Sequence, residues 1–135
     1  MPLVLVDSSV WIAYYQPRGS EDLKAAVKEL IERDEVAING IIAVEVLRGT
    51  TSEEDYLRVL SDMEAFNELP LDWSAFRRSS KLGFDLRRRG IAVPTTDIVI
   101  AATALESGCS LWHRDNHFDL IAEHTGLKVE NWLKR

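Results

Sequence analysis

Four acidic side chains lie in or against segments that otherwise have the composition of a buried core. They are Asp7, Glu45, Asp97 and Asp115, and each is the lone acid of its apolar segment. Asp and Glu are almost never fully buried unless they are paired or bind a metal ion. The intervals between the four are 38, 52 and 18 residues, so only folding can bring them together. A shared site for divalent cations is the simplest explanation for all of them.

Carboxylates that are crowded together repel one another, and one of them is then forced to take up a proton. A divalent cation removes this conflict, and a ligand set made of oxygen atoms suits magnesium or manganese better than zinc or copper. Such ions lower the pKa of a bound water and stabilise the charge on a phosphate during its transfer. Two ions about 3.5–4 Å apart stabilise both the attacking and the leaving oxygen. The four residues therefore predict a metal-dependent phosphodiesterase.

Short apolar runs alternate with amphipathic patterns along the chain, which predicts strands that alternate with helices. Strands are expected at residues 3–6, 36–38, 66–71, 110–112 and 128–130. Helices are expected at about residues 10–14, 21–31, 40–48, 52–63, 73–89, 97–107 and 115–124. We expect Ser8 or Ser9 to cap the first helix, and Ser20, Asn39 and Ser52 to cap later ones. The alternation indicates an α/β domain with a mostly parallel central sheet of four to five strands.

The four acids occupy positions that such a fold brings to one place. In an open parallel sheet, binding sites form beyond the carboxyl ends of the strands. Asp7 follows the first expected strand, and Asp115 comes just after the fourth. Glu45 lies on the helix after the second strand, and Asp97 lies at the N-terminus of a helix. All four can therefore face the same edge of the sheet.

Composition restricts the class of protein. The 135 residues are the size of one domain, 46% of them are hydrophobic, and no apolar run reaches the ~20 residues that span a bilayer. The N-terminus lacks the basic stretch and long apolar region of a signal peptide. Cys109 is the only cysteine, which rules out an internal disulfide and a cysteine zinc cluster. We expect a single domain over residues 1–135, in a cytoplasmic protein.

Four segments that contain the acids resemble the motifs of a PIN-domain nuclease, and specifically of a VapC-type toxin from a type II toxin–antitoxin pair. They read LVDSSVW at 5–11, VEVLRG at 44–49, TDIVIAATA at 96–104 and RDNHFDLI at 114–121. All four occur in order and extend over almost the whole chain, which makes the resemblance specific. It implies a three-layer α/β/α PIN-like fold around the parallel sheet.

The resemblance also implies an endoribonuclease toxin that needs Mg²⁺ or Mn²⁺, cuts tRNA or ribosomal RNA and is inhibited by a cognate VapB-type antitoxin. It implies a homodimer or a toxin–antitoxin hetero-oligomer. By this analogy the four acids are catalytic and hold the metal ions, which orient and activate water, so that hydrolysis leaves a 5′-phosphate and a 3′-hydroxyl. On the same basis, contacts to the substrate are assigned to Ser8, Ser9, His113 and Arg114.

His113 departs from the pattern of the family, because relatives often carry Thr or Ser two residues before the last acid. Its ring could contact RNA, hydrogen-bond Asp115 or point away from the site. His113 and His117 are four residues apart, but their segment is expected to be a strand end and a loop, so a shared zinc site is disfavoured. Asp119 is either a fifth acid of the site or, more simply, an acid in the first turn of a helix.

The net charge of −6 disfavours a nucleic-acid partner at first sight, but the charge is unevenly distributed. Residues 1–72 sum to −9 and residues 73–135 to +3, and the segment 77–89 carries six basic side chains against one acid. Bound cations would also offset the acidic centre. The basic segment is either a solvated helix face or a contact surface for RNA or the antitoxin.

Simpler structural roles compete with the metal site at each acid. Asp7 and Asp97 could be helix caps. Glu45 could pair with Arg48, three residues further on, and Asp115 could be a turn former. The four-part pattern favours the metal site over these separate explanations.

Other functions lack their characteristic residues. An aspartate phosphatase would need an acid where Ser9 stands, and a phosphate-accepting receiver would need an acceptor Asp on a central strand and a late Lys. Dinucleotide binding would need a Gly-x-Gly-x-x-Gly turn after the first strand. A catalytically inactive PIN fold that only binds RNA or protein is the remaining alternative, and it is disfavoured because all four acids are present.

Overall fold

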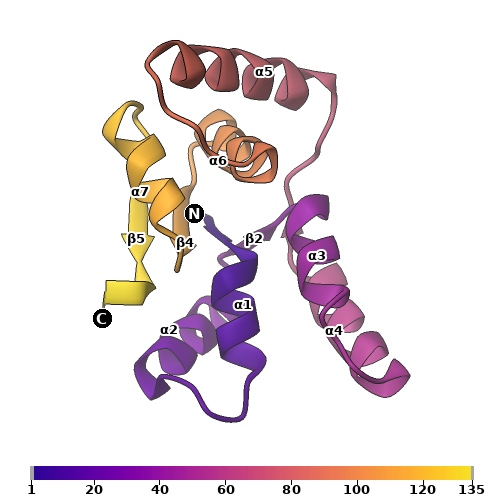
Figure 1. The fold of residues 1–135 in the computed structure, drawn as a ribbon. Coiled ribbons are helices and arrows are strands. Elements are labelled where there is room, and N and C mark those ends of the chain that lie inside the picture. Colours follow the sequence, from indigo (N-terminus) through magenta and orange to yellow (C-terminus); the bar gives the residue numbers. More distant parts are fainter. Residues whose placement is uncertain (1, 135) are drawn as a thin grey trace.

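The structure is a computed structural model that describes residues 2–134. Figure 1 shows its fold, in which short strands lie among helices. Within this range the strands are β1 (Val4–Val6), β2 (Val36–Ile38), β3 (Asn67–Glu68), β4 (Ser110–His113) and β5 (Val129–Asn131). The helices are α1 (Ser8–Tyr15), α2 (Glu21–Glu32), α3 (Gly40–Leu47), α4 (Glu53–Ala65), α5 (Trp73–Arg88), α6 (Thr95–Ser107) and α7 (Asn116–Glu123), and a 3-10 turn η1 covers Trp132–Lys134.

The strands form one parallel sheet in the order β3-β2-β1-β4-β5. β1 is central and pairs with β4 from Val4↔Ser110 to Val6↔Trp112. On its other side β1 pairs with β2. Because these strands run the same way, their carboxyl ends share one edge of the sheet. The predicted α/β fold with a parallel sheet of four to five strands is confirmed.

Helix α6 crosses the middle of the molecule and is buried on nearly all sides from Val99 to Ala104. Helix α5 packs along it, and Gly83 permits this because a Cβ there would lie 3.3 Å from the Ile98 side chain. No helix within residues 2–134 combines the length and the apolar character that crossing a bilayer requires. The apolar pattern of α6, which predicts a central helix, is explained by this position.

Two of the predicted boundaries are wrong. Helix α1 begins at Ser8, and its cap is Asp7 rather than Ser8 or Ser9. Strand β3 spans only two residues instead of 66–71. Pro70 has no N–H to donate to a neighbouring strand, and the chain turns at once toward Asp72, which caps α5. The caps Ser20, Asn39 and Ser52 are confirmed.

The end of α6 generates a stability prediction. Gly108 caps this helix in the left-handed conformation, with φ 69°, where any side chain is strained although no described atom within 4 Å would obstruct a Cβ. Gly108→Ala should lower stability by about 1 kcal/mol, measured by urea unfolding. Gly126→Ala is the matched control, because a Cβ there also has no described atom within 4 Å and its φ is not left-handed. Equal stability of the two variants would contradict the account of this cap.

Candidate active site at the carboxyl edge of the sheet

The ends of β1 and β4 bring two of the acids to the same edge. The Asp7 N–H donates to the Trp112 carbonyl at 2.9 Å, which extends the pairing of the two strands by one residue. Asp115 follows two residues after the end of β4. Asp7 and Asp115 therefore leave neighbouring strands at the same level, as the sequence predicts.

Asp7 is buried and serves as the N-cap of α1. One carboxylate oxygen, Oδ2, accepts hydrogen bonds from the Ser9 N–H at 3.1 Å and from the Ser9 hydroxyl at 2.5 Å. Burial raises the pKa of Asp7, the two Ser9 hydrogen bonds oppose that shift, and the charge of Glu45 adds to it. Capping is thus one role of this carboxylate, and both Ser9 hydrogen bonds use the same oxygen, Oδ2.

Ser9 connects the two strand ends. Its hydroxyl donates to Asp7 and accepts from the Arg114 N–H at 2.9 Å. The single hydroxyl proton is therefore used inside the protein, which makes Ser9 a support for Asp7 in this structure. Arg114 itself is exposed beside the site.

Glu45 reaches the same region from α3. Its Oε1 accepts a hydrogen bond from the Ser8 hydroxyl at 3.1 Å, and its charge raises the pKa of Asp7. The alternative partner, Arg48, forms no ion pair with Glu45 among the described residues. Glu45 is half-buried, so it faces both the site and the solvent.

Asp97 is the most strongly perturbed of the four acids. It lies in the first turn of α6, is 9% exposed, and is not the cap, because Pro94 occupies that position. Burial raises its pKa to about 6; the charge of Asp115 adds to the shift, a hydrogen bond from His117 opposes it, and Asp7 adds again. Helix capping therefore does not explain Asp97, whereas its burial, together with the nearby charges of Asp115 and Asp7, does explain its raised pKa.

Asp115 and His117 are placed by one turn at the start of α7. Asp115 is the N-cap of this helix, and its Oδ1 accepts from the His117 N–H at 2.9 Å. The imidazole Nδ1 of His117 lies 3.0 Å from Oδ2 of Asp97 and 3.2 Å from Oδ1 of Asp115. Ligand atoms of these three residues all lie within 4.8 Å of one another, and no other such group of three occurs among the described residues.

His113 is buried and supports the turn at Asp115 through a hydrogen bond with its main chain. The ring is 0% exposed, its Nδ1 accepts from the Asp115 N–H at 3.0 Å, and its Nε2 lies 3.1 Å from Oδ1 of Asp119. A backbone N–H can only donate, so the proton of the neutral ring is on Nε2 and points to Asp119. Burial lowers the pKa of His113, against the opposing charge and hydrogen bond of Asp119, which keeps the ring neutral.

These observations correct the assignment of His113 to substrate contact, because a fully buried ring cannot reach RNA. Of the three orientations that the sequence leaves open, a hydrogen bond to Asp115 is the one found, made to its main chain. Asp119 lies behind His113, where its other oxygen accepts from the Asn131 side chain at 2.7 Å. Asp119 is therefore a support of His113 and not a fifth member of the close cluster.

The four acids are brought together unequally. Asp97 and Asp115 share a close cluster with His117, and Asp7 and Glu45 lie outside it. The charge of Asp7 raises the pKa of Asp97, and the charge of Glu45 raises that of Asp7. A divalent cation fits this donor set, since it would relieve the repulsion that raises the pKa of Asp97. Sequence reasoning considered His117 only together with His113, as a disfavoured zinc pair, and did not place it beside Asp97 and Asp115. Its spacing of two from Asp115, at the start of a helix, is the signal that could have identified it.

The basic segment 77–89 does not form one surface. Arg77, Arg78 and Lys81 line a groove beside the C-terminal half of α6, and Lys81 pairs with Asp85 at 3.1 Å. Arg87 lines a different groove, against the N-terminal half of α6. Contact of this segment with RNA or an antitoxin stays a prediction.

Comparison with known proteins identifies the family of the chain. Residues 4–124 match the PIN domain. Ribonuclease VapC51 of Mycobacterium tuberculosis is 32% identical over 132 residues, 96% of this chain and 91% of that protein. Ribonuclease VapC1 of Methanocaldococcus jannaschii is 31% identical over 129 residues, 93% of this chain and 85% of that protein.

Solved structures share the fold at lower identity. The structure of DNA-bound VapBC from Salmonella typhimurium has a TM-score of 0.79 at 20% identity, and the match covers 98% of this chain and 99% of that one. FitAcB from Neisseria gonorrhoeae has a TM-score of 0.73 at 18% identity over 96% of this chain and 97% of that one. The chain therefore belongs to the PIN-domain family, and its 31–32% identical relatives are VapC proteins.

Proposed function

We propose that this protein is a VapC-type toxin, an endoribonuclease that hydrolyses phosphodiester bonds of tRNA or ribosomal RNA and is held inactive by a VapB-type antitoxin. The observation that carries the proposal is the close grouping of Asp97, Asp115 and His117, whose ligand atoms lie within 4.8 Å of one another. The charge of Asp7 acts on Asp97, and that of Glu45 acts on Asp7. The names of the relatives, ribonucleases VapC51 and VapC1, support the activity. The solved VapBC complexes with the same fold support the partner.

Asp7, Glu45, Asp97 and Asp115 would hold Mg²⁺ or Mn²⁺ in this proposal. When bound, such a cation stabilises negative charge on the phosphodiester and eases the deprotonation of water. The residues of the chain supply the positions: the Asp7 and Asp115 helix caps fix two carboxylates, and Ser8 orients Glu45. Arg114, exposed beside Asp115, can bind a phosphate of the substrate. The expected products carry a 5′-phosphate and a 3′-hydroxyl.

The proposal predicts that RNA cleavage needs both the cation and Asp7. Asp7→Asn should reduce cleavage at least about 100-fold, because it removes a ligand charge, while Asn preserves the helix cap. Asp72→Asn is the matched control, since Asp72 caps α5 through Ala75 at 3.0 Å outside the site. Cleavage of total RNA is measured with Mg²⁺, with Mn²⁺ and with EDTA.

Two results would count against this mechanism. RNA cleavage that is unchanged by EDTA would show that the cation has no role in it. Absence of cleavage of any RNA by a folded sample with Mg²⁺ or Mn²⁺ would favour the alternative function, an inactive PIN fold that only binds RNA or protein.

The raised pKa of Asp97 predicts how stability depends on pH in the metal-free protein. An acid whose pKa is higher in the folded state binds its proton more tightly there, so its ionisation costs stability. The cost is absent below the unfolded value of 3.8 and is complete above the folded value of about 6. In EDTA at about pH 7.5, Asp97→Asn should therefore be more stable by on the order of 1 kcal/mol, a rise of a few degrees in Tm.

The same variant should be inactive, and its gain in Tm over the wild type should disappear as the pH falls to about 4. Thermal melts across this pH range, followed by circular dichroism, measure the difference. A lower Tm than the wild type at about pH 7.5 would instead indicate that the ionised carboxylate is needed for the fold.

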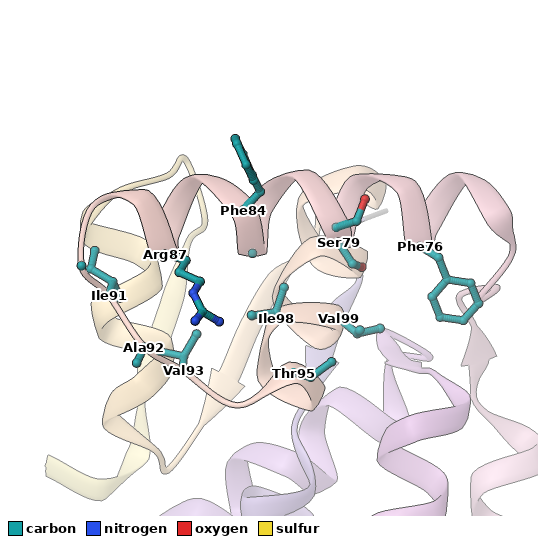
Figure 2. A pocket seen from close by; sticks show the side chains of 13 residues that line it. Phe76, Ser79, Phe84, Arg87, Ile91, Ala92, Val93, Thr95, Ile98 and Val99 are labelled. Atoms are coloured by element: carbon teal, nitrogen blue, oxygen red, sulfur yellow. The ribbon is translucent and has the colours of Figure 1, made fainter.

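We also propose that the protein is a homodimer through the face formed by α5 and the start of α6. A groove of about 860 Å³ lies there, lined mostly by apolar side chains. Figure 2 shows Arg87 directed into it. Phe84 stands outward at its rim and is 54% exposed, and Phe76 is exposed further along the same helix. Homodimer interfaces are more apolar than the rest of a protein surface, which favours this face.

Phe84→Glu tests the homodimer. Burying a charge in an apolar interface is costly, so the variant should raise the dimer dissociation constant at least about 100-fold. Sedimentation velocity over a dilution series measures it. Leu57→Glu on α4 is the control, because Leu57 is 56% exposed away from this groove. A wild type that is monomeric at all concentrations, or a Phe84→Glu variant that still dimerises normally, would contradict the assignment.

A further inference from the structure

The only nitrogen in the close cluster belongs to His117, and its position is fixed from two sides. Its main chain N–H is held by the Asp115 carboxylate at 2.9 Å, which sets the start of α7. Its ring Nδ1 lies 3.0 Å from an oxygen of Asp97 and 3.2 Å from one of Asp115. The ring thus directs one nitrogen to the point on which both carboxylates converge.

The side chain of His117 is 44% exposed. His117 is therefore not needed to fill the core, unlike His113, which is enclosed beside Phe118. A cation that binds between Asp97 and Asp115 would meet this nitrogen together with the two oxygen atoms, because all three lie within 4.8 Å of one another.

We propose that His117 is a ligand of the cation and biases the site toward manganese and against magnesium. This inference rests on the proposed metal-dependent function. Mg²⁺ takes oxygen ligands almost exclusively and demands a near-ideal octahedron, whereas imidazole suits first-row transition metals. A carboxylate site without the nitrogen discriminates less between the two ions. Replacing the nitrogen by oxygen at the same place should therefore reduce the discrimination.

The substitution His117→Asn makes this exchange, because the Oδ1 atom of Asn can lie near the position of Nδ1. The exposure of the side chain allows the variant to fold. Isothermal titration calorimetry with Mg²⁺ and with Mn²⁺ gives the ratio of the two dissociation constants in the wild type and in the variant, without reference to RNA cleavage. His124→Asn is the matched control, since His124 is exposed at the other end of α7.

We expect the preference for Mn²⁺ to fall about tenfold in His117→Asn, mainly through weaker Mn²⁺ binding, and to be unchanged in His124→Asn. If the wild type binds both ions but the ratio is the same in His117→Asn, His117 is not a ligand and this inference is overturned, while the proposed nuclease stands. If the folded wild type binds neither ion, the metal-dependent function is overturned as well.

Discussion

The constraint on which this site depends is the burial of carboxylates that lie close to one another. Asp97 shows its effect most clearly, since burial and the charges of Asp115 and Asp7 raise its pKa to about 6. A protein that served only its own stability would not keep such a group, because each ionised neighbour makes the next more costly. In the proposed function, a bound cation would offset this repulsion. The candidate site would then be a place where the protein gives up stability for binding.

Neutral hydrogen-bonding groups hold these acids without cancelling their charge. Ser9 joins Asp7 to the Arg114 main chain across the β1–β4 edge. His113, neutral and buried, holds the Asp115 turn and is itself held by Asp119. Had a Lys or Arg taken either position, it would compete with a cation for the same carboxylates. Ser9 and His113 instead fix the positions of Asp7 and Asp115 and leave the negative charge of these carboxylates available.

Local signals explain how much of the molecule could be predicted from sequence. Short β-branched runs and the caps Ser20 and Asn39 depend on neighbouring residues, so the strand order along the chain and most helix starts follow from them. The positions of the four acids, after strands or on helices, likewise follow from the neighbouring residues in the sequence. The directions of the His113 and His117 rings are not determined locally, because they depend on how α7 packs against α6 and β5. The sequence therefore predicts the acids but not which histidine joins them.

Anomalous diffraction from a crystal grown with Mn²⁺ tests the central claim most directly. The account predicts a manganese peak between Asp97 and Asp115, within reach of Asp7, with Glu45 at the rim of the site. A well-ordered crystal in which these carboxylate oxygens are too far apart to share an ion, and in which manganese is absent from this edge of the sheet, would contradict it.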